Sequence, residues 1–303
     1  MLTIDWTSEE PADAGHHVLA VAVSSADCAE TVERRFGGPI ARAAQAARFR
    51  GRPGEKFAFL RERGGHPQQV VLFGAGTGPH TAATVRSLAF DAVRAGQAAG
   101  VGQVVVDLRA LAAGGDVVHF GELVAQGLGL GTYRYDRWFS SAEKKQPPSV
   151  GHVTVVVGET AAAEGGARGQ IVAAAVAKAR DLVNGPANLI TPSYLADVAH
   201  AIAGAHADRV RCTVLEREDC ERLGMGCYLA VARGSAQPPK FIHLQYTPQG
   251  ASKGRVCLVG KGVTFDSGGL SLKPSDAMMG MKMDMGGAAA VLCALEGAAK
   301  GIR

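Results

Sequence analysis

Several patterns that would assign a chain to a common class are missing from these 303 residues. There is no H-E-x-x-H sequence and the nine histidines are scattered, so a histidine-rich zinc site is not supported. There is no G-x-S-x-G sequence, which argues against a serine hydrolase built around that turn. The six cysteines include no C-x-x-C pair, which favours reduced, buried thiols over a disulfide framework.

Signals for export and for membranes are also lacking. The first residues, "MLTIDWTSEEPADAGHH", contain early acids and no apolar core of a signal peptide. No apolar run approaches the ~20 residues of a membrane-spanning helix. The sequence therefore predicts a cytoplasmic protein with no membrane partner.

Charge is modest overall but uneven along the chain. The net charge is +4, and the stretch Arg34 to Arg63 contains nine basic residues against two acids, Glu55 and Glu62. A solvated helix face followed by a polar loop is the favoured interpretation, and a nucleic-acid contact is the sharper one. Residues 1–165 hold 16 basic and 17 acidic residues, so this region as a whole is not basic. The aromatic pattern of a single-strand binder is absent.

Hydrophobic periodicity predicts an α/β fold in two parts. In the first part, strands alternate with helices, which indicates parallel strands joined by crossovers. The expected strands are 16–23, 67–78, 101–108 and 151–158, and the expected helices are 27–47, 80–100 and the start of 120–133. We place the end of this domain in the small, polar segment 159–170 and assign residues 1–165 to it.

The second part, residues 166–303, is predicted to be α/β with a mixed or parallel sheet. Gly185 and Pro186 end a long first helix, and Thr191 with Pro192 begins the next one as N-cap and first residue. The expected helices are 171–188, 191–207, 216–223 and 286–300, and the expected strands are 209–215, 240–246 and 255–260.

Two glycine-rich turns resemble phosphate loops without matching them. "FGAGTG" (73–78) follows an expected strand, but Pro79 stands where a dinucleotide loop needs its third glycine. In "GKG" (260–262), Gly262 follows the lysine where a Walker loop needs serine or threonine. Nucleotide binding through the first turn is therefore the weakest functional interpretation of this sequence.

The stretch "LVGKGVTFDSGGLSLKPSDAMMGMKMDMGG" (258–287) carries most of the chemical signal. It places two lysines and two aspartates among glycines and methionines: Lys261, Asp266, Lys273 and Asp284. Each alone is an ordinary surface lysine or capping aspartate, but together they suggest a cation site. A lysine binds metal only as the neutral amine, whereas a charged lysine can stabilise an oxyanion. This combination points to metal-assisted hydrolysis of a carbonyl compound.

Two segments of this stretch closely resemble the leucine aminopeptidase (cytosol aminopeptidase) family of dinuclear metallopeptidases. They are "GKGVTFDSGGLSLKP" (260–274) and "MKMDMGGAAAV" (281–291), and "ARDLVNGPANLITPSYLA" (179–196) is similar to the beginning of that family's catalytic domain. The resemblance covers about residue 168 to the end of the chain. It implies a macro-like regulatory or oligomerisation domain over 1–165 and the N-terminal part of the catalytic domain over 166–303.

The resemblance also implies a role for individual residues. Lys261 would be the amine ligand of the tighter metal site, and Asp266 would bridge two metals. Asp284 would ligate the tighter-bound metal and help to hold the free amino group of the substrate. Lys273 would be the catalytic lysine that polarises the scissile carbonyl, and Met281 would line the pocket for the first side chain. The implied cofactors are two divalent ions, Mn²⁺ or Zn²⁺.

The family's pattern continues with N-T-D-A-E-G-R, which supplies an aspartate ligand, a bridging glutamate and a catalytic arginine. Residues 285–303 contain one acid, Glu296, inside a helical pattern. We therefore expect a C-terminally truncated leucyl aminopeptidase, acting on peptides with a free N-terminus and hexameric at full length, with little activity in the 303 residues alone. The alternative is an inactive family remnant that binds DNA, or regulates, through Arg34–Arg63.

Overall fold

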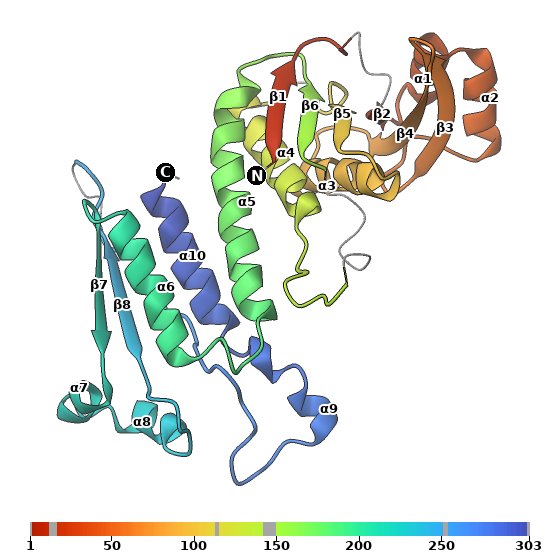
Figure 1. The fold of residues 1–303 in the computed structure, drawn as a ribbon. Coiled ribbons are helices and arrows are strands. Elements are labelled where there is room, and N and C mark those ends of the chain that lie inside the picture. Colours follow the sequence, from red (N-terminus) through yellow and green to blue (C-terminus); the bar gives the residue numbers. More distant parts are fainter. Residues whose placement is uncertain (1, 12–16, 113–114, 142–149, 251–253, 302–303) are drawn as a thin grey trace. The chain divides into compact units, whose positions relative to one another are not determined.

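The computed structural model describes residues 2–11, 17–112, 115–141, 150–250 and 254–301. The chain forms two compact units, Met1–Ala173 and Ala174–Arg303. Helix α5 (Ala162–Asn184) begins in the first unit and ends in the second (Figure 1). The domain boundary predicted at 165/166 lies in the first turns of α5, and a regulatory role for residues 1–165 stays a prediction.

The first unit is built on a six-stranded sheet with the order β1-β6-β5-β2-β4-β3. All neighbouring pairs are parallel except the antiparallel hairpin of β3 and β4. The strands are β1 (Thr3–Thr7), β2 (Val18–Ser24), β3 (Lys56–Arg63), β4 (His66–Gly76), β5 (Gln103–Asp107) and β6 (His152–Val156). The continuous apolar run of β2, "VLAVAVS", suits a central parallel strand because both of its faces are buried.

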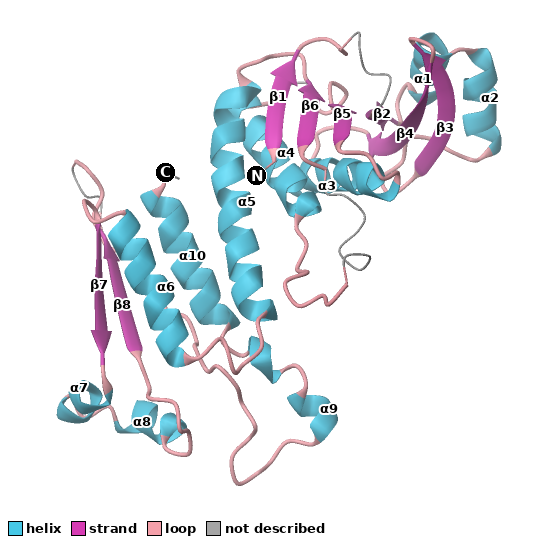
Figure 2. Ribbon diagram, in the orientation of Figure 1, coloured by secondary structure: helices cyan, strands magenta, loops and turns pink. Residues whose placement is uncertain are grey.

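Helices cover both faces of this sheet, which confirms the predicted α/β fold (Figure 2). They are α1 (Cys28–Phe36), α2 (Gly38–Ala46), α3 (Ala82–Ala98), α4 (Val117–Thr132) and the start of α5. Alternate residues of β2 belong to two separate cores: Val18 packs in the core with α3 and α4, and Leu19 packs in the core with α1 and α2. The helix expected over 27–47 is two helices, because Gly37 adopts φ +89° between them.

The second unit packs helices against a two-stranded antiparallel sheet, β7-β8. Its elements are α6 (Pro192–Ala205), β7 (Val210–Leu215), α7 (Arg217–Arg222), α8 (Gly226–Ala232), β8 (Phe241–Tyr246), α9 (Ser275–Met278), the 3₁₀ turn η2 (Met281–Met283) and α10 (Gly286–Ala299). Leu182 of α5, Ile202 of α6 and Leu292 of α10 meet in its core. The N-cap prediction is confirmed, since the Thr191 hydroxyl accepts a hydrogen bond from the Tyr194 N–H.

Two predictions for the second unit are wrong. Its sheet is antiparallel rather than mixed or parallel, and residues 255–260 form no strand in the described part of the chain. The side chains of Val256 and Val259 are 88% and 89% exposed. An apolar, β-branched run has the local preference for a strand, but a strand also needs a partner backbone, and the run itself does not encode one.

The segment Ser275–Ala299 is long and apolar enough to cross a membrane by length and composition alone. In the structure it is not one helix but three pieces, α9, η2 and α10. The 14 residues of α10 span ~21 Å, less than the ~30 Å of a bilayer core. Met285, Ala289 and Leu292 are buried among side chains of α5 and α6, so α10 is a core helix of this unit.

Candidate metal centre

The four charged residues predicted from the sequence lie on the long connection between β8 and α10 (Figure 1). Lys261 belongs to the segment 254–263, which is neither helix nor strand, and Asp266 lies just before the turn at 269–270. Lys273 stands two residues before α9, and Asp284 lies between η2 and α10. The structure brings them together as two ion pairs, Lys261 with Asp284 and Lys273 with Asp266.

Both oxygens of one carboxylate converge on one amine. Lys261 Nζ lies 2.6 Å from Asp284 Oδ1 and 2.7 Å from Oδ2. The Asp284 side chain is 19% exposed, whereas that of Lys261 is 58% exposed. The pair therefore joins a mostly buried carboxylate to an exposed lysine. An amine and a carboxylate arranged in this way are two donors that could share one cation.

A close backbone contact holds Lys261 beside Asp284. The Lys261 carbonyl accepts a 2.8 Å hydrogen bond from the N–H of Ala288, in the first turn of α10. That N–H has no partner within its own helix, so the contact caps α10. Glycines make the approach possible: a Cβ on Gly287 would lie 2.8 Å from Lys261 N, and one on Gly260 would collide with the Gly287 carbonyl.

The second pair is built on a tight turn. The Asp266 carboxylate accepts a 2.9 Å hydrogen bond from the N–H of Gly268, and Lys273 Nζ lies 3.4 Å from its other oxygen. Gly268 and Gly269 adopt φ +97° and +80°, which allows the chain to reverse here. The hydrogen bond from the Gly268 N–H is the main cause of the lowered pKa of Asp266; burial opposes it, and the charges of Lys273 and Lys261 lower the pKa further. The influence of Lys261 on Asp266 links the two pairs electrostatically.

One contact beside the site could not be predicted from the sequence. Lys282 Nζ donates a 2.8 Å hydrogen bond to the carbonyl oxygen of Asn184, the last residue of α5. Lys282 lies two residues before Asp284, beside half-buried Met281. A lysine between two methionines has no recognisable ligand spacing, and its partner is 98 positions away. No local pattern in the sequence points to this contact.

The donors present fit one cation better than two. In the described part of the chain, no three His, Cys, Asp or Glu side chains gather, so a site here depends on the Lys261 amine. Lys261, Asp284 and Asp266 together offer an amine nitrogen and carboxylate oxygens, which are suitable donors for Mn²⁺ or Zn²⁺. Glu296 is engaged elsewhere, 2.5 Å from Lys178 and 2.8 Å from Lys300.

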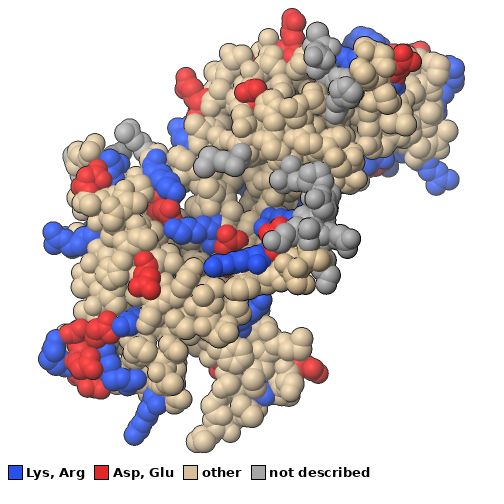
Figure 3. Space-filling model, viewed as in Figure 1, with Lys and Arg blue, Asp and Glu red and all other residues tan. Residues whose placement is uncertain are grey.

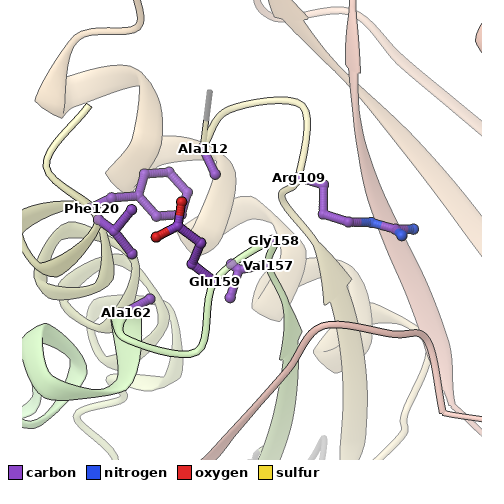
Figure 4. A pocket seen from close by; sticks show the side chains of 8 residues that line it. Arg109, Ala112, Phe120, Val157, Gly158, Glu159 and Ala162 are labelled. Carbon is purple, nitrogen blue, oxygen red and sulfur yellow. The ribbon is translucent and has the colours of Figure 1, made fainter. Parts of the chain in front are cut away.

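The first unit contains a separate pocket of about 240 Å³ at the carboxyl ends of β5 and β6. Its lining includes Phe120, Val157 and Glu159. In Figure 4 the Glu159 side chain lies beside Phe120, whereas the Arg109 side chain points away from both. The Arg109 guanidinium instead lies 2.6 Å from Asp107. The pocket thus presents apolar groups and a carboxylate, which does not suit a phosphate.

The basic stretch Arg34–Arg63 is only partly a solvated surface. Arg35, Arg61 and Arg63 all contact the carboxylate of Glu10, and Arg35 also lies 2.6 Å from Asp107. The expected polar loop includes strand β3, in which side chains alternate between exposed and half-buried. On the face shown in Figure 3, basic and acidic side chains are mixed, with no continuous basic surface. These contacts do not favour the DNA-binding alternative.

Comparisons with known proteins show which family the chain resembles. Residues 19–141 match the family model described as the cytosol aminopeptidase family, N-terminal domain, and residues 177–302 match the catalytic domain of the same family. A probable cytosol aminopeptidase of Synechococcus sp. (strain CC9605) is 40% identical over 287 residues, covering 93% of this chain and 57% of the relative. One of Gloeobacter violaceus is 54% identical over 147 residues, covering 48% of this chain and 28% of the relative.

Solved structures show the same similarity. A tomato leucine aminopeptidase mutant superposes with a TM-score of 0.83 at 28% identity, covering 99% of this chain and 60% of that one. The bottromycin maturation enzyme BotP in complex with Mn has a TM-score of 0.73 at 35% identity, covering 94% and 56%. These three proteins match nearly all of this chain, but the chain spans only 56–60% of their length.

Proposed function

The chain belongs to the cytosol aminopeptidase family, and from this premise we propose that it acts as a metal-dependent aminopeptidase. Its substrates would be peptides with a free N-terminus, with leucine as the preferred first residue. The observation that carries the proposal is the convergence of the Lys261 amine with both oxygens of Asp284. A surface ion pair of this kind adds little to stability, whereas an amine and a carboxylate held this close together can bind one cation once the amine has lost its proton.

Three side chains would hold the metal. Lys261 and Asp284 form the more complete donor pair, and Asp266 contributes an oxygen that could be shared with a second ion. When bound, a divalent ion would act as a Lewis acid and lower the pKa of water, so that hydroxide is available to attack a carbonyl near neutral pH. Mn²⁺ and Zn²⁺ are both proposed, and two ions per full site follow from the family resemblance. The second ion needs more donors than Asp266 alone.

Metal binding would compete with the existing ion pairs. Lys261 donates a lone pair only after it loses its proton, so binding through this residue releases a proton into solution. Metal affinity is therefore expected to rise with pH. Asp284, freed from the Lys261 ammonium, would also accept a hydrogen bond from the amino group of the substrate.

Lys273 would keep its charge and face the scissile carbonyl, where an ammonium stabilises the developing oxyanion. Its backbone N–H donates to the Ser267 carbonyl at 2.9 Å, which ties the lysine to the same turn as Asp266. Met281, half-buried before Asp284, would contact the first side chain of the substrate. An apolar thioether suits a leucine side chain.

The proposal is tested by Mn²⁺-dependent binding of L-leucinamide to residues 1–303, measured by calorimetry. We expect binding with Mn²⁺, no binding without it, and no binding by the Asp284→Asn variant in either condition. Equal heats with and without Mn²⁺ would contradict a metal-dependent substrate site. D-leucinamide is the matched control, because its side chain cannot reach the same wall while its amino group is held.

Cellular context is proposed on the same basis. The relatives are named cytosol aminopeptidases, which supports a cytoplasmic location for this chain. A homo-hexamer is proposed for the full-length protein from the family resemblance, and its mass in solution by light scattering would test it. A DNA-binding role has no supporting contact among the described residues, since Arg35, Arg61 and Arg63 are held by the carboxylates of Glu10 and Asp107.

A further inference from the structure

The ammonium of Lys282 contacts the end of a helix from another part of the chain. Its Nζ donates to the Asn184 carbonyl at 2.8 Å, and the side chain is half-buried. The last four carbonyls of a helix lack partners within that helix and carry the negative end of its dipole. An ammonium is therefore stabilised at this position, and the contact joins η2 to α5.

The end of α5 is a firm point of attachment. Leu182, in the last turn of α5, is buried in the core of the second unit with Met285. The Gly185 N–H continues the helical pattern by donating to the Asp181 carbonyl at 3.0 Å. A group that is bound to the Asn184 carbonyl is thus bound to a well-packed part of the unit.

Asp284 lies between this attachment and two others. On its N-terminal side, Lys282 is held by Asn184; directly after it, the Met285 side chain is fully buried; and further on, the Ala288 N–H donates to the Lys261 carbonyl. From this we propose that Lys282 is a positioning residue, which fixes the Asp284 carboxylate at the cation site by tying η2 to the end of α5. This inference rests on the proposed metal-dependent function.

Lys300 provides a matched control. It lies at the end of α10, where its ammonium is 2.8 Å from Glu296, so its removal also deletes one lysine contact in the same unit. No contact of Lys300 involves residues 281–284 among the hydrogen bonds and ion pairs of the described chain. A purely structural effect of losing a lysine contact should be similar for the two variants.

The test is Mn²⁺ affinity of the whole chain, titrated by electron paramagnetic resonance, with thermal unfolding measured on the same samples. We expect Lys282→Met to weaken Mn²⁺ binding about tenfold, as is typical when a residue that supports a metal ligand is lost. Lys282→Arg should bind within about threefold of the parent chain, because its guanidinium can donate to the same carbonyl. Lys300→Met should bind Mn²⁺ as the parent chain does.

Two results would overturn the inference: unchanged Mn²⁺ affinity in Lys282→Met, or an equal loss in Lys300→Met. If Lys282→Met does not fold, Lys282→Leu, which also lacks a donor, replaces it, and unchanged affinity in that variant has the same meaning. The parent chain distinguishes the positioning role from the proposed function. If the parent chain does not bind Mn²⁺, the proposed function itself is contradicted. If the parent chain binds Mn²⁺ and the Lys282 variants bind it equally well, only the positioning role is contradicted.

Discussion

One methyl group at Gly287 is expected to separate Lys261 from Asp284 while leaving α10 folded. A Cβ at this position would lie 2.8 Å from Lys261 N and 3.3 Å from its carbonyl oxygen. Both neighbours are backbone atoms, which cannot rotate away as the end of a side chain can. The segment 260–262 would have to move off the first turn of α10, and it would take Lys261 with it.

Two opposing effects set the magnitude. Alanine favours a helix over glycine by about 1 kcal/mol. Overpacking against fixed atoms costs about 1–3 kcal/mol. The Gly287→Ala variant should therefore lose at most about 2 kcal/mol of unfolding free energy, which urea denaturation can measure. Its Mn²⁺ affinity should fall by much more than this small loss of stability suggests, because the contact that fails is the one beside the site.

The neighbouring glycine is the control for this prediction. A Cβ on Gly286 would meet only the Val183 side chain, at an ordinary 3.7 Å. Gly286→Ala should thus be neutral or stabilising by up to about 1 kcal/mol, with unchanged Mn²⁺ binding. If the two alanine variants behave alike in both measurements, close backbone packing does not position Lys261, and the reasoning is refuted.

Three further predictions concern single groups. Because the pKa of Asp266 is lowered in the folded state, its ionised form stabilises the fold above about pH 4, and this contribution is lost as the pH falls through the lowered pKa. Asp266→Asn should therefore be less stable than the parent chain at pH 7. An equal difference in stability at pH 2 would contradict this prediction. Burial raises the pKa of Cys293 to about 11, so iodoacetamide at pH 8 should label exposed Cys257 well before Cys293, as mass spectrometry would show. Residues 285–303 supply one acid, Glu296, already bound by two lysines; we therefore expect little hydrolysis of leucine anilide by Mn²⁺-loaded residues 1–303, and rapid turnover would show that the second ion has other donors.

Local signals explain what could be predicted from the sequence. The N-cap at Thr191 and the apolar run of β2 depend only on neighbouring residues, and the structure confirms both. Strand β3 was missed because its alternating pattern, "KFAFLRER", is rich in charge. The run 255–260 has the local preference of a strand, so its sequence predicts one, but sheet pairing depends on residues far away in the chain.

The site shows the same difference between local signals, which can be predicted, and contacts between distant residues, which cannot. The motif around Lys261 and Asp284 identified the charged residues, and the structure places those two side chains in direct contact. The means of holding them together could not be predicted, because each contact joins distant positions. Lys282 reaches Asn184 across 98 positions, and the Lys261 carbonyl reaches the first turn of α10 through backbone atoms that are alike in every sequence.

The cation site shared by Lys261 and Asp284, on which the proposed function depends, is tested most directly by titrating Mn²⁺ into the parent chain, Lys261→Met and Asp284→Asn. We predict saturable binding by the parent that strengthens between pH 6 and pH 8, and at least tenfold weaker binding by each variant, with both variants still folded. Binding by Lys261→Met as tight as that of the parent would contradict a shared site, since the amine would then be only the partner of a surface ion pair.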